Sequence, residues 1–382
     1  MNLLFLTPRW FPMHGGVAKS AARLVNSLRD KVSTIHVATL DSTLAPGMTH
    51  AALNGNVVVH RMGFLDEMPE TLSLLSMLLE ALHRKNKFHV VHGFFLYPMG
   101  TMAAWIGRKL NIPSVVSIRG NDLHQGVFSE KQFPFVSWTL QNANAVTCNA
   151  KEMLAPCKLL APKAKPSYIP NGVDVLQFRP REKDSMLSSQ FQTEGKTCLG
   201  FVGELKLKKG AAHLLSCFKH VHERVPSKLF IIGEIRAPER RFVHRFINQN
   251  PELTDDVHIV PYVEDSLELC RYYNLLDIIL FPSLWDGMPN ALLEAMACGK
   301  IVIGSMVGGI QDVLAHKKNG FLIPFLELPR LGELCVDVIR LPEKEKEKIR
   351  ARARETVVQT YTLEKERDAF ASLYRRVSKR RS

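Results

Sequence analysis

The chain has 382 residues, of which 46% are hydrophobic and 23% are charged, and its formal net charge is +13. This length allows two domains, and the composition is ordinary for a soluble globular protein. The excess of basic residues leans towards the first half of the chain. A basic surface suits an anionic partner, such as a phospholipid surface, a nucleotide or a nucleic acid, and it equally fits a surface that only aids solubility.

The cysteines and the apolar segments indicate the compartment. Seven cysteines are scattered along the chain, and none forms a C-x-x-C pair. This odd count argues against a disulfide framework or a zinc site and favours a reducing compartment. The sequence shows no signal peptide, and its most apolar windows, residues 71–82 and 94–107, are shorter than a bilayer span. We therefore expect a cytoplasmic protein that would meet a membrane only as a peripheral protein on its inner face.

Apolar runs alternate with amphipathic segments along the first half of the chain. The expected strands are residues 2–6, 32–40, 57–59, 88–92, 114–118 and 145–148. The expected helices are residues 17–28, 69–84, 99–110, 133–142 and a segment that starts at 149. This alternation predicts a doubly wound α/β domain with a parallel sheet, which we assign to residues 1–175.

The second half repeats the alternation after a polar and charged segment, residues 176–196, which we expect to be the interdomain linker. The expected strands are residues 198–202, 228–232, 258–261, 277–282, 301–303 and 321–323. The expected helices are residues 211–224, 239–248 and 289–299, followed by three helical segments that end the chain. The sequence therefore predicts a second doubly wound domain, residues 197–361, and a cleft between the two domains.

Glycines and lysines follow the first strand of each half, at the edge where open α/β sheets bind ligands. Gly15 and Gly16 would let the backbone approach a phosphate at a helix N-terminus. The loop after residues 198–202 carries Lys206, Lys208 and Lys209, and a lysine there can neutralise a phosphate. Taken singly, such residues are more often packing glycines and solvated lysines than a phosphate site.

The segment 276–309 places two carboxylates near the start of a helix. Asp286 lies in the loop before this helix, and Glu294 lies within it, beside an apolar stripe. An isolated Asp there is usually a cap, and an isolated helical Glu is usually solvated. With the lysines on a neighbouring strand end, however, these carboxylates suit a nucleoside diphosphate that bears a sugar. A carboxylate accepts two vicinal hydroxyls, and cations and helix N-termini stabilise a departing diphosphate.

Several other chemistries lack their motifs. The chain contains no Asp-x-Asp, which disfavours a diphosphate held by a metal ion. It also lacks H-E-x-x-H, G-x-S-x-G and the P-loop pattern, which weakens protease, α/β-hydrolase and P-loop functions. The first turn does not match G-x-G-x-x-G, which weakens a nicotinamide-binding function.

Four segments together resemble a known family. They are I-P-N-G-V-D (169–174), F-V-G-E-L-K-L-K-K-G (201–210), F-P-S-L-W-D-G-M-P-N-A-L-L-E-A-M-A-C-G (281–299) and V-G-G-I-Q-D-V (307–313). Their order resembles family 4 of the retaining, metal-independent glycosyltransferases of the GT-B fold. The resemblance implies two Rossmann-like domains that face each other across a cleft, with the nucleotide-sugar mainly on the second and the acceptor mainly on the first. It also implies that a C-terminal helix, residues 362–379, crosses back to the first domain, and that no metal or cofactor is needed.

The resemblance assigns roles to particular residues. Asp286 and Glu294 stand at the two ends of the E-x7-E motif of the family, so that Glu294 would bind the ribose hydroxyls and Asp286 the donor sugar. Lys209 would contact the diphosphate, helped by the backbone of Gly15 and Gly16. Further donor contacts are expected at Asn290, Leu292 and Leu293.

The sequence departs from the family at four of these positions. Asp286 replaces a Glu that is one methylene longer, and Asp312 also stands where Glu is usual. Glu204 replaces an Arg, so that Lys206 is expected to supply the missing charge. Arg119 occupies the position of a His that often touches the transferred sugar, and an arginine cannot act as a base at neutral pH. These differences bear on the identity of the donor more than on the fold.

The sequence therefore predicts transfer of a sugar from a nucleoside-diphosphate sugar to a hydroxyl of a glycan or a lipid-linked acceptor. The resemblance implies retained configuration and front-face attack, in which the departing phosphate oxygen takes the acceptor proton, and UDP is favoured over GDP. One alternative is a nucleotide-sugar epimerase of the same architecture. Another is a basic nucleic-acid-binding protein, although the sequence shows no groove-reading helix or stacking aromatic set.

Overall fold

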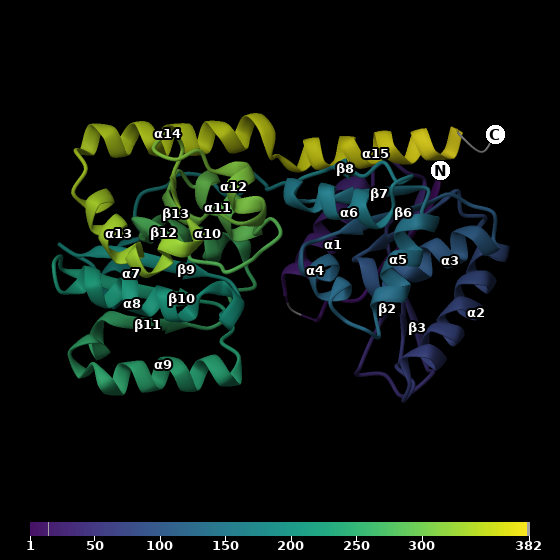
Figure 1. Ribbon diagram of the computed structural model, residues 1–382, viewed down its shortest axis with the longest axis horizontal. Helices are drawn as coiled ribbons and strands as arrows, with labels where there is room; N and C mark the ends of the chain where they lie inside the picture. The colour runs from purple at the N-terminus through teal and green to yellow at the C-terminus, as the bar shows by residue number, and fades with distance from the viewer. Residues whose placement is uncertain (14, 380–382) are drawn as a thin grey trace. The chain divides into compact units, whose positions relative to one another are not determined.

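The computed structural model describes residues 1–13 and 15–379. It divides into two compact units (Figure 1), one formed by residues 1–171 with the segment from 363 onwards and the other by residues 172–362. Both units are α/β, with helices around a mainly parallel sheet. Among the described residues no helix is long and apolar enough to cross a membrane. All seven cysteines lie in this part of the chain as buried free thiols.

The first unit is built on an eight-stranded sheet in the order β3-β4-β2-β1-β5-β6-β7-β8. Neighbouring strands pair in parallel, except that β3 runs antiparallel to β4. The sequence did not predict β3, because its THAALN segment is exposed throughout and carries no apolar pattern. The strands are β1 (Asn2–Thr7), β2 (Thr34–Leu40), β3 (Thr49–Asn54), β4 (Val57–Met62), β5 (Val90–Phe94), β6 (Ser114–Ile118), β7 (Ala145–Cys148) and β8 (Ser167–Tyr168).

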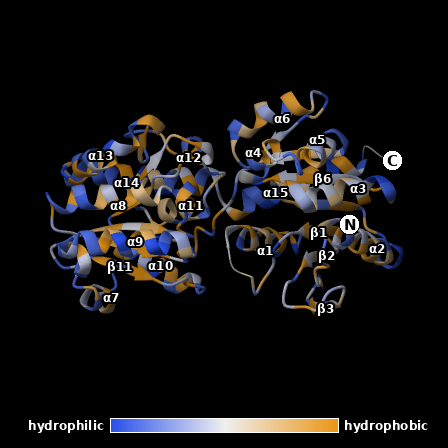
Figure 2. Ribbon diagram, turned by 60° about the horizontal axis from the view of Figure 1, so that its bottom comes forward, coloured by the Kyte–Doolittle hydropathy of each residue, from blue (hydrophilic) through white to orange (hydrophobic). Residues whose placement is uncertain are grey.

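Helices cover both faces of this sheet, because successive side chains of a buried strand point to opposite faces. Leu3 and Phe5 of β1 pack with α1 and α15, whereas Leu4 and Leu6 pack with α2 and α3. Figure 2 shows mainly hydrophobic strands beneath helices of mixed hydropathy. The helices are α1 (Gly16–Leu28), α2 (Met68–Asn86), α3 (Thr101–Lys109), α4 (Asn121–Val127), α5 (Phe133–Asn142), α6 (Leu154–Leu160) and α15 (Leu363–Lys379).

The second unit contains a six-stranded parallel sheet in the order β11-β10-β9-β12-β13-β14. Counted from its own first strand, this is the order 3-2-1-4-5-6 of the Rossmann fold, and the direction of winding reverses between β9 and β12. Ligands bind at the carboxyl ends of the strands at such a switch point. The strands are β9 (Thr197–Val202), β10 (Ser227–Ile232), β11 (Val257–Val260), β12 (Ile278–Phe281), β13 (Ile301–Ser305) and β14 (Phe321–Ile323).

Helices again cover both faces of the second sheet. The core on one of these faces joins side chains of the strands to α8 and α13. The helices are α7 (Ser185–Gln190), α8 (Ala211–His222), α9 (Ala237–Gln249), α10 (Ser266–Leu275), α11 (Asn290–Ala297), α12 (Gly308–Val313), α13 (Leu331–Ile339) and α14 (Glu343–Thr360).

Residues 176–196, which we expected to link the domains, belong instead to the second compact unit. Helix α7 lies within this segment, and its Leu187 is buried. Asp184 caps the helix by accepting a hydrogen bond from the backbone N–H of Leu187 at 3.0 Å, and it also pairs with Arg271 at 2.7 Å. The polar composition suggested a linker because the residue that anchors this segment to the unit, Arg271, belongs to α10, far along the chain.

The C-terminal helix α15 is fastened to the first sheet by a buried polar chain. The hydroxyl of Tyr374 lies 2.6 Å from Nδ1 of His92, and Nε2 of His92 lies 2.7 Å from Oγ of Ser117. Ser117 in turn contacts Thr147 at 2.7 Å. Burial lowers the pKa of His92 to about 3, so this imidazole is neutral and can accept one hydrogen bond while it donates the other.

Replacing Tyr374 by Phe tests this attachment. Tyr374→Phe leaves a buried ring nitrogen of His92 without its partner, and we expect the free energy of unfolding to fall by about 1–3 kcal/mol. Urea unfolding followed by circular dichroism would measure the change. Tyr97→Phe, at a half-buried tyrosine of the same unit, serves as the control, and equal losses in both variants would contradict the role of the Tyr374 hydroxyl.

Candidate functional site

Two loops meet at the switch point of the second sheet, one after β9 (residues 203–210) and one after β12 (residues 282–289). The backbone N–H of Leu284 donates to the carbonyl of Lys208 at 2.8 Å. Gly210 permits this approach, because its φ is +74° and a Cβ there would lie 1.9 Å from the carbonyl oxygen of Pro282. The two loops therefore form one continuous surface.

A third segment, the start of α12, closes against the loop after β12. Gly308 has a φ of +51°, and a Cβ there would lie 1.8 Å from the carbonyl oxygen of Asp286. The backbone N–H of Gly309 donates to the carbonyl of Gly287 at 2.7 Å. Residues 307–312 belong to the family-like segment V-G-G-I-Q-D-V, and their sequence of two glycines at a strand end suits a turn that offers N–H groups to a ligand. The structure instead forms a helix from Gly308 and uses the Gly309 N–H group to hold the neighbouring loop.

Asp286 and Lys209 form an ion pair where these loops meet, and both side chains are largely buried. Burial by itself would raise the pKa of Asp286, but Lys209 and Lys208 outweigh it and hold the pKa below its ordinary value of 3.8. Burial lowers the pKa of Lys208 to about 8, although Asp286 opposes the shift. The site thus combines one ionised carboxylate with two lysines.

Glu294 lies in the middle of α11 and is 5% exposed. Tyr273 of α10 donates its hydroxyl proton to the Oε2 atom of Glu294 at 2.8 Å. Burial, and then the neighbouring Glu294, raise the pKa of Tyr273 well above its ordinary value, so the hydroxyl stays protonated as a donor. We had placed Glu294 beside the apolar stripe of this helix, and the structure shows it held in the interior by Tyr273.

Besides Glu294, three donor contacts were predicted on α11, and they differ in their exposure; Leu292 is fully buried and Asn290 is half-buried. Asn290 is the first residue of the helix, at its positive N-terminal end. Leu293 is fully buried, so its side chain belongs to the core and a ligand could meet only its backbone.

Lys206 lies beside Glu204, with its Nζ atom 2.7 Å from Oε2. Arg236, which the sequence analysis missed, also pairs with Glu204. Burial would raise the pKa of Glu204, but Lys206 and Arg236 lower it overall. The register of β9 and β10 explains this pairing, since the bridge between Leu205 and Ile235 puts Arg236 next to Lys206. The charge expected from Lys206 is thus shared within a cluster of two cations and one carboxylate.

The first unit contributes a glycine pair at its own switch point, between β1 and β5. Gly15 has a φ of +123°, which favours glycine. A Cβ at Gly16 would meet no described atom within 4 Å, so internal packing of the described residues does not explain this glycine. Both residues lie at the start of α1, as the predicted phosphate-binding turn requires.

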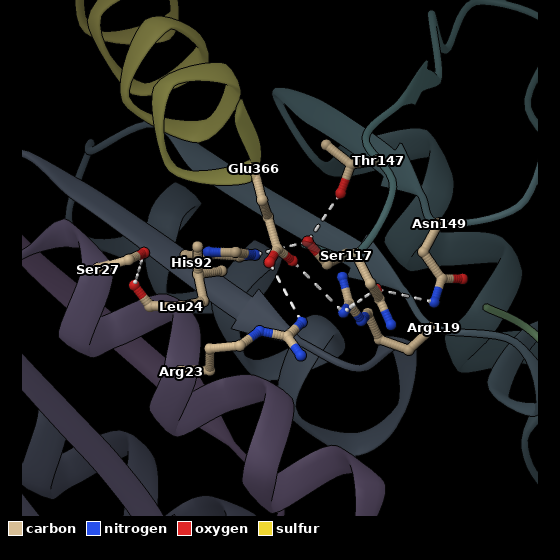
Figure 3. Close-up of polar contacts among 10 residues, drawn as sticks. Arg23, Leu24, Ser27, His92, Ser117, Arg119, Thr147, Asn149 and Glu366 are labelled. Carbon is tan, nitrogen blue, oxygen red and sulfur yellow. Dashed lines mark hydrogen bonds and ion pairs between the residues drawn. The ribbon is translucent and has the colours of Figure 1, made fainter. Parts of the chain in front are cut away.

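Arg119 follows β6 of the first unit, and its side chain is 5% exposed. Figure 3 shows it pointing toward Glu366. The Nη2 atom of Arg119 donates to Oδ1 of Asn171 at 2.6 Å and lies 3.8 Å from Oε1 of Glu366, which comes from α15. Glu366 also pairs with Arg23 at 3.2 Å. Burial lowers the pKa of Arg119 to about 10, although Glu366 opposes this, so the guanidinium remains charged. These contacts hold the side chain of Arg119 in the interior of the first unit. Its contact with a sugar stays a prediction.

The predicted site residues thus fall into two groups. The second unit brings together, at one edge of its sheet, Lys206, Lys209, Asp286, Asn290, Leu293 and Glu294. The first unit holds Gly15, Gly16 and Arg119. Within the described ranges no group of three or more His, Cys, Asp or Glu side chains is arranged to hold a metal ion.

Comparison with protein families gives two matches that together cover most of the chain. Residues 14–176 match the family described as Glycosyltransferase Family 4. Residues 196–339 match the family described as Glycosyl transferases group 1. The two matches correspond closely to the two sheets.

Several curated proteins are similar over most of their length. N-acetyl-alpha-D-glucosaminyl L-malate synthase of Bacillus anthracis is 21% identical over 370 residues, which cover 95% of this chain and 94% of that protein. A UDP-Gal:alpha-D-GlcNAc-diphosphoundecaprenol alpha-1,3-galactosyltransferase of Escherichia coli is 23% identical, with coverage of 82% and 80%. A GDP-mannose-dependent alpha-mannosyltransferase of Corynebacterium glutamicum is 25% identical, with coverage of 74% and 67%.

Solved structures share the fold. Sucrose-phosphate synthase from Thermosynechococcus elongatus superposes with a TM-score of 0.83 at 19% identity, and the match covers 98% of each chain. Anabaena HepE in complex with UDP and glucose gives a TM-score of 0.80 at 17% identity, with coverage of 98% and 99%. At these identities the likeness establishes the architecture, two Rossmann-like domains of the GT-B type.

The contact between the loops after β9 and β12 predicts how much a methyl group added at Gly210 lowers the stability of the protein. Gly210→Ala places a Cβ against the Pro282 carbonyl at positive φ, whereas Gly195→Ala meets nothing within 4 Å at a similar φ of +69°. The positive φ costs each variant about 1 kcal/mol, so we expect a clearly larger loss of stability for Gly210→Ala by urea unfolding. Equal losses would show that the loops need not touch.

The Asp286–Lys209 pair predicts a pH dependence. Because the folded pKa of Asp286 is lowered, this carboxylate stabilises the fold above its unfolded pKa, and the contribution is lost as the pH falls through the folded value. Lys209→Met removes the main opposing charge, so burial raises the pKa. We expect the free energy of unfolding of Lys209→Met to be about 3 kcal/mol lower than that of the wild type at pH 7. This difference should shrink as the pH approaches 4, and urea unfolding would measure it.

The double variant Asp286→Asn with Lys209→Met is the control for this prediction. It contains no carboxylate at position 286, so its difference from Asp286→Asn alone should be independent of pH. A loss in Lys209→Met that stays constant between pH 7 and 4 would contradict the proposed coupling.

Proposed function

The chain belongs to the family 4, group 1 retaining glycosyltransferases of the GT-B fold, and we propose that it transfers a sugar from a nucleoside-diphosphate sugar to a hydroxyl of a glycan or a lipid-linked acceptor. The observation that carries the proposal is the buried Glu294 on α11, the helix that directly follows the loop with the Asp286–Lys209 pair at the switch point. This arrangement offers a carboxylate for vicinal hydroxyls and cations for a diphosphate within one site.

We assign the ribose hydroxyls to Glu294. Tyr273 fixes one oxygen of this carboxylate at 2.8 Å, which orients the group before a ligand arrives. Asn290 lies at the N-terminus of the same helix, where the helix dipole favours an anionic ligand. Arg236 and Lys206 add positive charge at the neighbouring strand ends, which favours an anionic ligand.

Lys209 and Asp286 would exchange partners when the donor binds. In the structure each neutralises the other. A diphosphate is a stronger partner for the ammonium group than one carboxylate, and its approach would leave the oxygens of Asp286 to accept hydrogen bonds from the donor sugar. As the sugar leaves, Lys209 would stabilise the charge that develops on the departing diphosphate. We assign no enzymic nucleophile and expect no metal ion, since the departing phosphate oxygen can take the acceptor proton.

We favour UDP over GDP as the base of the donor. The Escherichia coli relative is named for UDP-galactose, and the structural neighbour HepE was solved with UDP and glucose. The GDP-mannose-dependent relative makes GDP the alternative to test. The shorter arm of Asp286 acts at the donor sugar, so it bears on which hexose is accepted.

The acceptor and the location complete the proposal. A lipid-linked acceptor is supported by the diphosphoundecaprenol in the name of one relative. The net charge of +13 would help the protein to reach an anionic membrane surface from the cytoplasm. The proposed process is the synthesis of a cell-surface polysaccharide or glycolipid.

Glu294→Ala is the test of this function. We expect the variant to lose roughly 100-fold or more in turnover of its nucleotide-sugar, since two charge-assisted hydrogen bonds disappear. Release of UDP or GDP from the donor would report turnover. Unchanged turnover in a folded Glu294→Ala protein would refute the assignment.

Three controls separate binding from folding and from a different reaction. Tyr273→Phe removes the internal hydrogen bond and keeps the carboxylate, so it should retain most of the turnover that Glu294→Ala loses. Glu268→Ala, at an exposed position of α10, should behave like the wild type. Incubation with the donor alone distinguishes an epimerase, which would convert the sugar without an acceptor.

A further inference from the structure

The first unit contains an apolar groove that the proposed donor chemistry does not use. Its volume is about 680 Å³, which lies within the range of pockets that hold small ligands. Helix α3 lies between α2 and α5 along this groove, and side chains of all three helices line it. The apolar lining consists of Leu72, Met77, Met102, Trp105, Phe135 and Trp138.

Three of these side chains are unusually exposed for their size. Met77 is 66% exposed, Trp105 is 50% exposed and Phe135 is 44% exposed. The rings of Trp105 and Trp138 pack at 6.3 Å, and Phe135 packs on Tyr97 at 5.5 Å. An exposed group of large apolar side chains in a hollow indicates a binding surface rather than chance exposure. Tryptophan and methionine suit a flexible apolar ligand at a boundary with water.

The groove runs along the whole of α3, from Thr101 at its first residue to Lys109 at its last. At a rise of 1.5 Å per residue, this corresponds to about 12 Å. Thr101 lies at the carboxyl edge of the sheet, since α3 follows β5, and Phe135 lies in the first turn of α5 at the same edge. One end of the groove therefore opens at the edge where the site residues of this unit, Gly16 and Arg119, are found.

The opposite end is basic. Arg84 and Lys85 in the last turn of α2, and Arg108 and Lys109 in the last turn of α3, are exposed. Lys109 also pairs with Glu80 at 2.5 Å, inside the groove. This end would attract anionic headgroups, each basic residue near a charged surface contributing about 1 kcal/mol.

We propose that this groove binds the hydrocarbon chain of an anionic membrane lipid. The basic end of the groove rests on the headgroups, and the chain lies along α3 between the tryptophans. The charge at one end and the apolar lining along the rest of the groove match the charged headgroup and the apolar chain of such a lipid. The inference rests on the proposed function in one respect, since it places the unit expected to hold the acceptor at the membrane that carries it.

Tryptophan fluorescence tests the proposal directly. The full-length protein is mixed with vesicles of phosphatidylcholine and phosphatidylglycerol whose acyl chains are brominated, because bromine quenches an indole that it contacts. We expect quenching of the wild type, weaker quenching with pure phosphatidylcholine, and loss of most of the quenching in the double variant Trp105→Phe with Trp138→Phe. The remaining tryptophans, Trp10 and Trp285, lie outside the groove lining.

Vesicle co-sedimentation gives a matched pair of variants. Met77→Glu puts a charge into the groove at an exposed position and should lower partitioning onto the anionic vesicles roughly tenfold or more. Leu159→Glu, at an 82% exposed position of α6 outside the lining, should bind like the wild type. Absence of quenching in the wild type, or equal partitioning of the two variants, would overturn the proposal. So would a dimer in gel filtration that Met77→Glu dissociates while vesicle binding stays unchanged.

The donor provides an independent readout. Thermal stabilisation of Met77→Glu by a UDP-sugar should equal that of the wild type, because Met77 lies in the unit without the donor carboxylates. If the wild type binds the donor but no lipid, only the lipid-binding proposal is refuted. If it binds lipid but no donor, the proposed function is refuted and the groove remains a lipid site.

Discussion

An ionised carboxylate buried at the end of a β-strand is stable only where a cation and close backbone contacts surround it. Asp286 is such a group, and its pairing with Lys209 requires that the loop after β9 and the loop after β12 touch. Gly210 and Gly308 make the contact possible, because any side chain at either position would collide with a carbonyl of the loop after β12. The ion pair and the two glycines thus hold three strand ends as one surface, at the point where the sheet order reverses.

The first unit is organised around a different buried charge. Arg119 lies over the ring of Phe94 at 4.3 Å and shares Glu366 with Arg23. Because Glu366 belongs to α15, the last helix is tied to the loop that follows β6 (Figure 3). A charged residue at position 119 therefore stabilises the arrangement of the unit. At the start of α1, by contrast, a Cβ on Gly16 would meet open space, so packing of the described residues does not require a glycine there. The two units thus present different chemistry, with carboxylates and lysines on one and a glycine turn at a helix N-terminus on the other.

Strand periodicity and turn glycines made most of the fold predictable from the sequence. Residues 114–118, 145–148 and 321–323 were predicted to the residue, since buried parallel strands are continuous apolar runs. Strand β3 was missed because it is exposed, and α7 was taken for a linker because its anchors lie in α10. Single residues of the site followed from motifs, but their partners did not. Tyr273, Arg236 and Glu366 come from elements distant in sequence, and only the packed structure brings them to Glu294, Glu204 and Arg119.

Hydrogen exchange with and without a nucleotide-sugar tests the central claim most directly, because it locates the ligand without relying on turnover. The account predicts slower exchange of backbone amides in residues 203–210 and 282–297 when a UDP-sugar or a GDP-sugar is added, since these amides line the Asp286–Lys209 site and the start of α11. Exchange that stays unchanged in both segments with saturating amounts of either donor, or that slows only elsewhere in the chain, would contradict it.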